Sequence, residues 1–159
     1  MVRPRSRRSR QRLYETLDGN RILGWIEPVC GSLRRFYKKG KVAVQRFMLK
    51  SKIHRATLTG TDLDYEGSIA IDRLLIEAAD MLPGEQVHVL NVNSGARLIT
   101  YIIEAPAGSG TMLLNGPAAR LGMPGDKVVV LTYAAYTDEE ARKLKPIVVR
   151  VDAQNRPLK

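Results

Sequence analysis

A nine-residue pattern occurs twice in the second half of the chain. Residues 82–90 read LPGEQVHVL and residues 123–131 read MPGDKVVVL. Each copy has a Pro-Gly turn, an acidic residue and then a Val-rich run that is typical of a buried strand. Two related halves that each supply such a strand favour a closed six-stranded β-barrel, because closing the sheet removes its exposed edges.

The rest of the chain from Met48 onward has the pattern of short strands separated by turns. We expect strands over residues 51–59, 86–92, 97–103, 111–114, 127–133 and 146–152, each rich in Val, Ile, Leu, Thr or Tyr. One helix is expected from a cap at Asp72 to Leu82. Another begins at the capping box Thr137–Glu140 and ends before Pro146. The sequence therefore predicts a mainly β fold, a small barrel with a few short helices.

Length and composition fit one such domain. A chain of 159 residues with 44% hydrophobic residues can bury one core. No apolar run approaches the eighteen residues that a membrane span needs, so we expect no membrane contact. The single cysteine, Cys30, cannot form a disulfide within its own chain, which fits the reducing cytoplasm.

The net charge of +10 is carried by the N-terminal segment. Residues 1–47 contain 13 Lys and Arg against three acidic residues, whereas residues 48–159 contain 13 of each sign. The basic segment has little to bury, so we expect it to be disordered, or non-native with Met48 as the true start. Its functional alternative is an arm that binds nucleic acid, which the neutral charge of residues 48–159 disfavours.

Gly67 and Ser68 could provide a site at which the backbone cuts itself. Glycine offers a carbonyl carbon with no side chain in the way and can adopt strained backbone angles. The serine hydroxyl can attack that carbon. A Gly-Ser pair is most often only a turn, so the surrounding residues have to support this interpretation.

Five ordered motifs give that support. They are Lys52-Ile53-His54-Arg55, Tyr65-Glu66-Gly67-Ser68, Gly95-Ala96-Arg97 followed by Thr100-Tyr101, Asn115-Gly116, and Asp138-Glu139-Glu140-Ala141-Arg142. In residues 48–159 the chain resembles the pyruvoyl-dependent aspartate 1-decarboxylase family. The resemblance implies a double-psi β-barrel and the conversion of L-aspartate to β-alanine and CO₂ in the cytoplasm, for pantothenate and coenzyme A synthesis.

The resemblance also implies the cofactor. Decarboxylation of an α-amino acid needs an electron sink that no unmodified side chain provides. In the family, autocatalytic cleavage between Gly67 and Ser68 turns the serine into a covalent pyruvoyl group. The substrate amine then forms a Schiff base with its ketone. We expect no metal.

Roles for the other residues follow from the matching motifs. Tyr101 matches the proton donor, and Thr100 matches a residue that binds substrate and assists cleavage. Lys52 matches a ligand of the substrate carboxylate, and His54 lies close to the cleavage site in the family. Arg97 is expected to hold a carboxylate because its planar guanidinium group suits paired hydrogen bonds.

Residues 115–118 are expected to open a short helix whose free N–H groups could bind a carboxylate. The four residues are Asn115, Gly116, Pro117 and Ala118. The family usually has Ala after Asn-Gly, whereas Pro117 has no N–H to donate. Substrate binding that relied on this amide would have to use Gly116 or Ala118 instead.

The partners are also implied by the resemblance. It implies a homotetramer of cleaved α and β chains with sites between protomers. Thr100 and Tyr101 face opposite sides of a regular strand, so they can serve one site only if a bulge or a subunit boundary lies there. We expect the boundary, because the resemblance implies the homotetramer. Whether cleavage needs a maturation factor stays open. Other interpretations are an uncleaved β-barrel that serves as a binding module and a related enzyme that acts on glutamate or another amino acid.

Overall fold

The computed structural model describes residues 16–17, 20–21 and 44–158. The chain divides into two units, residues 1–41 and 42–159. In the first unit β1 (Thr16–Leu17) and β2 (Asn20–Arg21) pair antiparallel. Most of the basic N-terminal segment, including Cys30, lies outside the described residues. The second unit contains the expected barrel domain.

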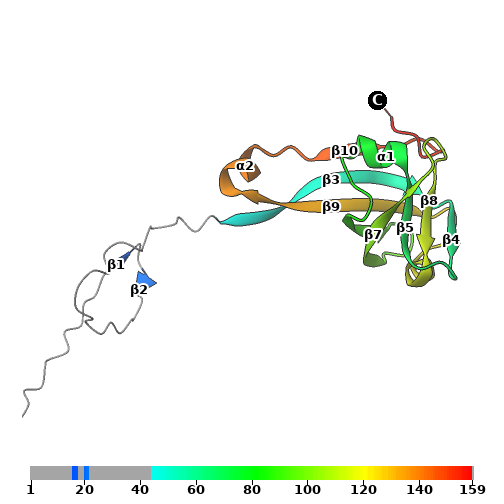
Figure 1. The fold of residues 1–159 in the computed structure, drawn as a ribbon, viewed down its shortest axis with the longest axis horizontal. Coiled ribbons are helices and arrows are strands. Elements are labelled where there is room, and N and C mark those ends of the chain that lie inside the picture. Colours follow the sequence, from blue (N-terminus) through cyan, green and yellow to red (C-terminus); the bar gives the residue numbers. More distant parts are fainter. Residues whose placement is uncertain (1–15, 18–19, 22–43, 159) are drawn as a thin grey trace, which may run out of the picture. The chain divides into compact units, whose positions relative to one another are not determined.

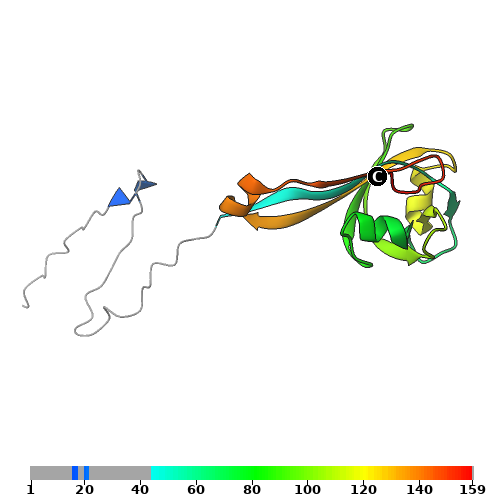
Figure 2. The same cartoon turned by 90° about the horizontal axis from the view of Figure 1, so that it is seen from above.

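One sheet forms the framework of the second unit, in the order β10-β3-β9-β6-β7-β5-β8-β4. Figure 1 labels most of its strands, and in Figure 2 the green and yellow strands curl into a ring. The strands are β3 (Gln45–Thr57), β4 (Gly60–Asp62), β5 (Ser68–Asp72), β6 (Gln86–Asn91), β7 (Arg97–Ala105), β8 (Met112–Asn115), β9 (Lys127–Thr137) and β10 (Ile147–Arg150).

The prediction of a mainly β, barrel-like fold is confirmed. The count differs, because eight described strands share the sheet and its end strands, β10 and β4, are not paired with each other. β4 exists because the chain turns after Thr57 and pairs again, parallel to β8. The core lies inside the curled sheet. It contains the fully buried side chains Ile53, Leu58, Ile69, Ile71, Leu75, Val87, Val89, Met112, Leu114, Val128 and Val130.

The repeated sequence pattern forms two equivalent turns that lead into neighbouring strands. Glu85 accepts a hydrogen bond from the N–H of Leu82 at 2.9 Å, and Asp126 accepts one from the N–H of Met123 at 3.0 Å. The strands that follow, β6 and β9, pair antiparallel. The order of turn, acid and strand that the two copies share therefore places one carboxylate across each turn.

Three short helices accompany the sheet: α1 (Arg73–Ala78), the 3₁₀ helix η1 (Gly116–Leu121) and α2 (Asp138–Lys143). α1 begins at the predicted cap Asp72 but ends four residues before Leu82, because Asp80 has φ +50° and breaks the helical path. The predicted capping box at Thr137 is present. In the described ranges no helix is both long and apolar enough to cross a membrane.

β3 and β9 form a long antiparallel ribbon, with α2 at its far end (Figure 1). Pairing extends from Gln45, opposite Thr137, to Thr57, opposite Lys127. The predicted boundary between residues 47 and 48 therefore falls inside β3. Arg46, which precedes this boundary, pairs with Asp138 at 2.5 Å.

Candidate active site

Ser68 is the first residue of β5, the strand between β7 and β8. It lies opposite Asn115 of β8, and the next residue, Ile69, lies opposite Ile102 of β7. Only 4% of Ser68 is exposed, and Gly67 is buried as well. The Gly-Ser pair is thus enclosed by the sheet and is not a surface turn.

The backbone at this pair is strained. Gly67 has φ +124° and Ser68 has φ +91°. Glycine adopts such angles readily, but a residue with a Cβ does so only when the surrounding structure forces it. Backbone strain of this kind costs about 1–3 kcal/mol and is concentrated at functional sites. The local conformation therefore singles out the peptide that the sequence identified.

The hydroxyl of Ser68 is held by backbone groups. It donates a hydrogen bond to the carbonyl oxygen of Tyr101 and accepts one from the N–H of Ile69. The contact is with the main chain of Tyr101 and not with its phenol ring. Tyr101 as a whole is 46% exposed. The structure thus brings Ser68 next to Tyr101, but through an atom that the sequence analysis did not consider.

A cavity of about 300 Å³ opens beside Ser68. Two of its lining residues, Ser68 and Thr100, carry hydroxyl groups, and the remaining five are apolar. These five are Leu98, Ile99, Pro117, Ala118 and Leu121. The volume lies at the lower end of the range for small-molecule sites, which suits a small substrate.

The residues expected at the site are only partly brought together. Ser68, Thr100, Pro117 and Ala118 line one cavity, while Arg97 lies on the exposed side of β7 and does not line it. The pairing of β7 with both neighbours shows no register shift. No bulge therefore turns Thr100 and Tyr101 to the same side.

Asn115 and Gly116 adjoin the cleavage site from β8 and η1. Asn115 is 3% exposed, and its Oδ1 has no hydrogen-bond partner among the described residues. The predicted short helix is present, with Pro117 near its start, where a missing N–H costs little.

Lys52 and His54 lie on β3, opposite β10 and away from the lining of this cavity. The Nδ1 of His54 is buried without a hydrogen-bond partner in the described part of the chain. Burial lowers the pKa of His54, and the positive charges of Lys52, Arg55 and Arg150 lower it further. His54 therefore stays neutral down to a lower pH than an unperturbed histidine does.

Sequence reasoning missed the apolar walls of the cavity. Leu98 and Ile99 precede Thr100 on β7, and Leu121 ends η1. Leu98 and Thr100 share one face of the strand through two-residue alternation, so the sequence carried a weak signal for Leu98. Nothing in the sequence indicated that Leu121 would reach the same place.

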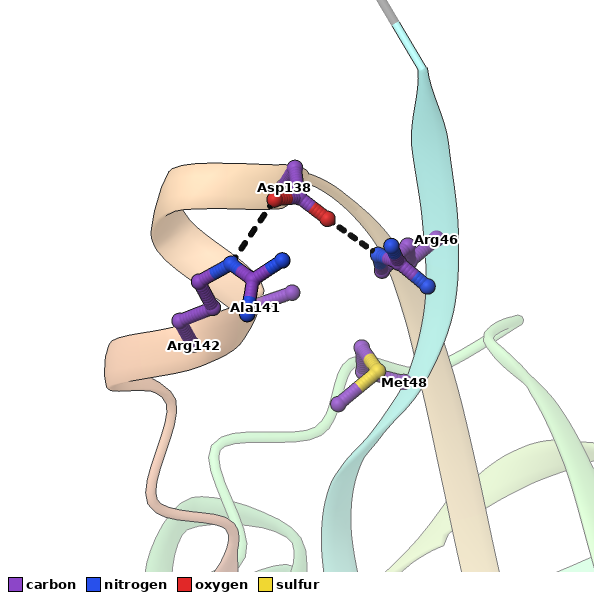
Figure 3. Close-up of a pocket in the computed structure, with 5 residues that line it drawn as sticks. All are labelled: Arg46, Met48, Asp138, Ala141 and Arg142. Atoms are coloured by element: carbon purple, nitrogen blue, oxygen red, sulfur yellow. Dashed lines mark hydrogen bonds and ion pairs between the residues drawn. The ribbon is translucent and has the colours of Figure 1, made fainter.

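A second hollow, of about 250 Å³, lies at the far end of the β3–β9 ribbon (Figure 3). Asp138 accepts hydrogen bonds there from Arg46 at 2.5 Å and from Arg142 at 2.8 Å. The Arg142 and Arg46 hydrogen bonds hold the pKa of Asp138 below its usual range. Met48 and Ala141 complete the lining, and none of the expected reacting groups is present. Across the described ranges no three His, Cys, Asp or Glu residues are grouped as a metal would require.

Comparison with known proteins decides the family. The sequence profile of the aspartate decarboxylase family matches residues 44–158. The chain belongs to this family. The resemblance inferred from the five motifs is confirmed, and the chain is an enzyme, a carboxy-lyase.

Individual relatives agree with this decarboxylase assignment. The aspartate 1-decarboxylase of Dehalococcoides mccartyi (strain ATCC BAA-2266 / KCTC 15142 / 195) is 61% identical over 109 residues, which cover 69% of this chain and 88% of the relative. That of Thermoanaerobacter pseudethanolicus (strain ATCC 33223 / 39E) is 55% identical over 115 residues, or 72% and 98%. Aspartate 1-decarboxylase 1 of Gloeobacter violaceus (strain ATCC 29082 / PCC 7421) is 60% identical over 111 residues, or 70% and 94%.

Proposed function

We propose that this decarboxylase converts L-aspartate to β-alanine and CO₂ for pantothenate synthesis, after it cuts itself between Gly67 and Ser68. The observation that carries the proposal is a buried serine with φ +91°, preceded by a glycine with φ +124°, on the wall of a cavity. Strain in the peptide raises its energy before the reaction, so part of the barrier to cleavage is already overcome.

Cleavage begins when the Ser68 Oγ forms a bond to the carbonyl carbon of Gly67. The peptide C–N bond breaks, and the hydroxyl proton passes to the freed amine. Loss of the Ser68 α-proton then breaks the Cβ–Oγ bond and expels the Gly67 carboxylate. Water hydrolyses the imine that remains at position 68, so ammonia is released and a pyruvoyl group is formed. The carbonyl of Tyr101 holds the hydroxyl before it reacts.

The residues around Ser68 fit a small ketone at that position. A pyruvoyl group would supply the electron sink for loss of the substrate carboxylate. Thr100 lines the same cavity and can donate a hydrogen bond to the oxyanion that forms at Gly67 during cleavage. Asn115 carries an oxygen with unused bonding capacity close to Ser68, which can accept a hydrogen bond from the substrate amine.

Binding of aspartate also needs positive charge for its two carboxylates, and none of the residues that line the cavity carries one. We assign that role to Arg97 and Lys52 and the proton transfer to the Tyr101 phenol, with His54 acting during cleavage. These groups would reach the cavity from a neighbouring copy in a homotetramer. Exposed apolar side chains near the site support such contacts, among them Ile99 (61%) and Leu121 (40%).

Intact mass under denaturing conditions tests the proposal. Cleavage of the 17.7 kDa chain should give fragments of about 7.5 and about 10 kDa, the larger carrying the ketone. Ser68→Ala should stay uncut. The chain contains a matched control at Gly108–Ser109, where the glycine also has a positive φ (+75°) but the serine is exposed. Ser109→Ala should be cut like the parent.

Activity and assembly are measured on the same samples. The cut protein should release CO₂ from L-aspartate and form β-alanine, whereas Ser68→Ala should not. A panel with glutamate decides the selectivity of the site. Sedimentation should give a particle of about four chains. A parent chain that stays whole after prolonged warming would contradict self-cleavage by the protein alone.

A further inference from the structure

Gly116 lies against the backbone of the cleavage site. It follows Asn115, which is paired with Ser68, so the start of η1 meets the residues that precede Ser68. A methyl group on Gly116 would lie 2.9 Å from the carbonyl oxygen of Tyr65 and 2.9 Å from the Cα of Gly67. It would also lie 3.1 Å from the nitrogen of Gly67.

These contacts leave no room for a side chain. Cβ atoms in proteins essentially never approach other heavy atoms within 3.0 Å. All three groups belong to the main chain, so no side-chain rotation can relieve the overlap. A Cβ at position 116 must therefore move either η1 or the segment 65–67, and the Gly67–Ser68 peptide is joined directly to that segment.

We propose that Gly116 is a positioning residue for self-cleavage. Because Gly116 has no side chain, residues 65–67 pack directly on the start of η1, which holds Gly67 and Ser68 at their positive φ values. This inference rests on the proposed cleavage at Ser68. It assigns to Gly116 a role in forming the pyruvoyl group, separate from any contact of residues 115–118 with the substrate.

Gly116 also has a positive φ (+56°), which by itself disfavours most side chains. Gly95 separates the two effects, because it has φ +74° and nothing lies within 4 Å of a methyl group placed there. Gly95→Ala therefore causes backbone strain without a collision. Gly110 supplies the opposite control. It has φ +68°, and a methyl group added to it would lie 2.5 Å from the main-chain oxygen of Gln154. Gln154 is not part of the cleavage site.

The experiment follows cleavage of the full chain by intact mass, with precursor purified in the cold and then warmed. Gly116→Ala should be cut at least about tenfold more slowly than the parent, since each factor of ten corresponds to about 1.4 kcal/mol in the barrier. Gly95→Ala should be cut within about twofold of the parent rate, because an open turn does not touch the scissile peptide. Unfolding in urea, measured in the uncut Ser68→Ala background, reports the stability of each variant separately.

Gly110→Ala distinguishes positioning from general destabilisation. It should lower stability and leave the cleavage rate of the folded protein within about twofold of the parent. If Gly116→Ala fails to fold, Gly116→Asn replaces it, because Asn tolerates a positive φ and still carries the colliding Cβ.

Three results would overturn the inference. They are parent-like cleavage of the folded Gly116 variant, equal slowing by Gly110→Ala, and no folded variant at position 116. A parent chain that is never cut would instead refute the proposed self-cleavage, and the role of Gly116 with it.

Discussion

Asp72 joins the strand that begins at Ser68 to two other parts of the domain. Asp72 is only 3% exposed. Its carboxylate accepts hydrogen bonds from the N–H of Leu74 at 2.8 Å, of Gly108 at 3.0 Å and of Gly110 at 2.6 Å. The first bond caps α1, and the other two fix the loop between β7 and β8. Removal of the carboxylate should therefore destabilise both elements at once.

The size of the effect follows from the exposure of each donor. Gly110 is buried, so its N–H without an acceptor costs about 1–3 kcal/mol. Loss of the cap at Leu74 adds about 0.5–2 kcal/mol. Gly108 is exposed, so its N–H can donate a hydrogen bond to water instead. We therefore expect Asp72→Ala to lower the free energy of unfolding by about 1.5–5 kcal/mol, the sum of these two contributions.

Asp72→Asn separates the two contributions. Asn caps helices as well as Asp does, so the bond to Leu74 should persist. The Gly110 N–H bonds the second oxygen, Oδ2, which Asn replaces with an NH₂ donor. Two donors then face each other, and the expected loss is about 1–3 kcal/mol.

Urea unfolding at fixed protein concentration measures these losses, in the Ser68→Ala background so that every chain is whole. Asp62→Ala is the control, because Asp62 is exposed and, among the residues that the structure describes, its carboxylate accepts only a local hydrogen bond from the N–H of Asp64 at 3.0 Å. Its effect should stay within about 0.5 kcal/mol. The reasoning is refuted if Asp72→Ala is as stable as this control, or if Asp72→Asn is less stable than Asp72→Ala.

Three further outcomes are expected. Burial and nearby positive charges lower the pKa of His54 in the folded state, whereas in the unfolded state this pKa is near 6.5. The folded state therefore binds the His54 proton less readily than the unfolded state does. Stability should therefore fall as the pH drops below about 6.5, and His54→Gln should lose this part of the pH dependence in urea unfolding; an unchanged profile would show that other groups cause it. Tyr101→Phe keeps the carbonyl that holds Ser68, so intact mass should show cleavage at the parent rate while decarboxylation falls at least tenfold; loss of cleavage would mean that the phenol is needed first. Asp138→Asn removes the charge that its two arginine partners share, so amide hydrogen exchange at the end of the β3–β9 ribbon should be faster than in the parent, and equal protection would show that the pairs contribute nothing.

The sequence predicted much of the fold because its local signals agree with one another. The repeated turns and the two caps at Asp72 and Thr137 were readable, since each depends on residues within a few positions. Strand β5 was missed, because Ser68–Asp72 is only five residues long and its pairing partners lie more than thirty positions away. Asn155 was missed for the same reason. Buried, it accepts a hydrogen bond from the N–H of Thr57 and donates to the carbonyl oxygens of Thr57 and Gly110.

The sequence by itself determined the family, the positions of six of the strands along the chain and the peptide at which cleavage is proposed. It could not explain why that peptide differs from the other Gly-Ser pair of the domain, Gly108–Ser109, since both pairs consist of a glycine followed by a serine. Only the tertiary structure separates them. Pairing with β7 and β8 buries Ser68 at φ +91°, and the bare Cα of Gly116 makes room for the turn before it, whereas Ser109 stays exposed in a loop. Strain needs neighbours that prevent its release, and those neighbours are distant in the sequence.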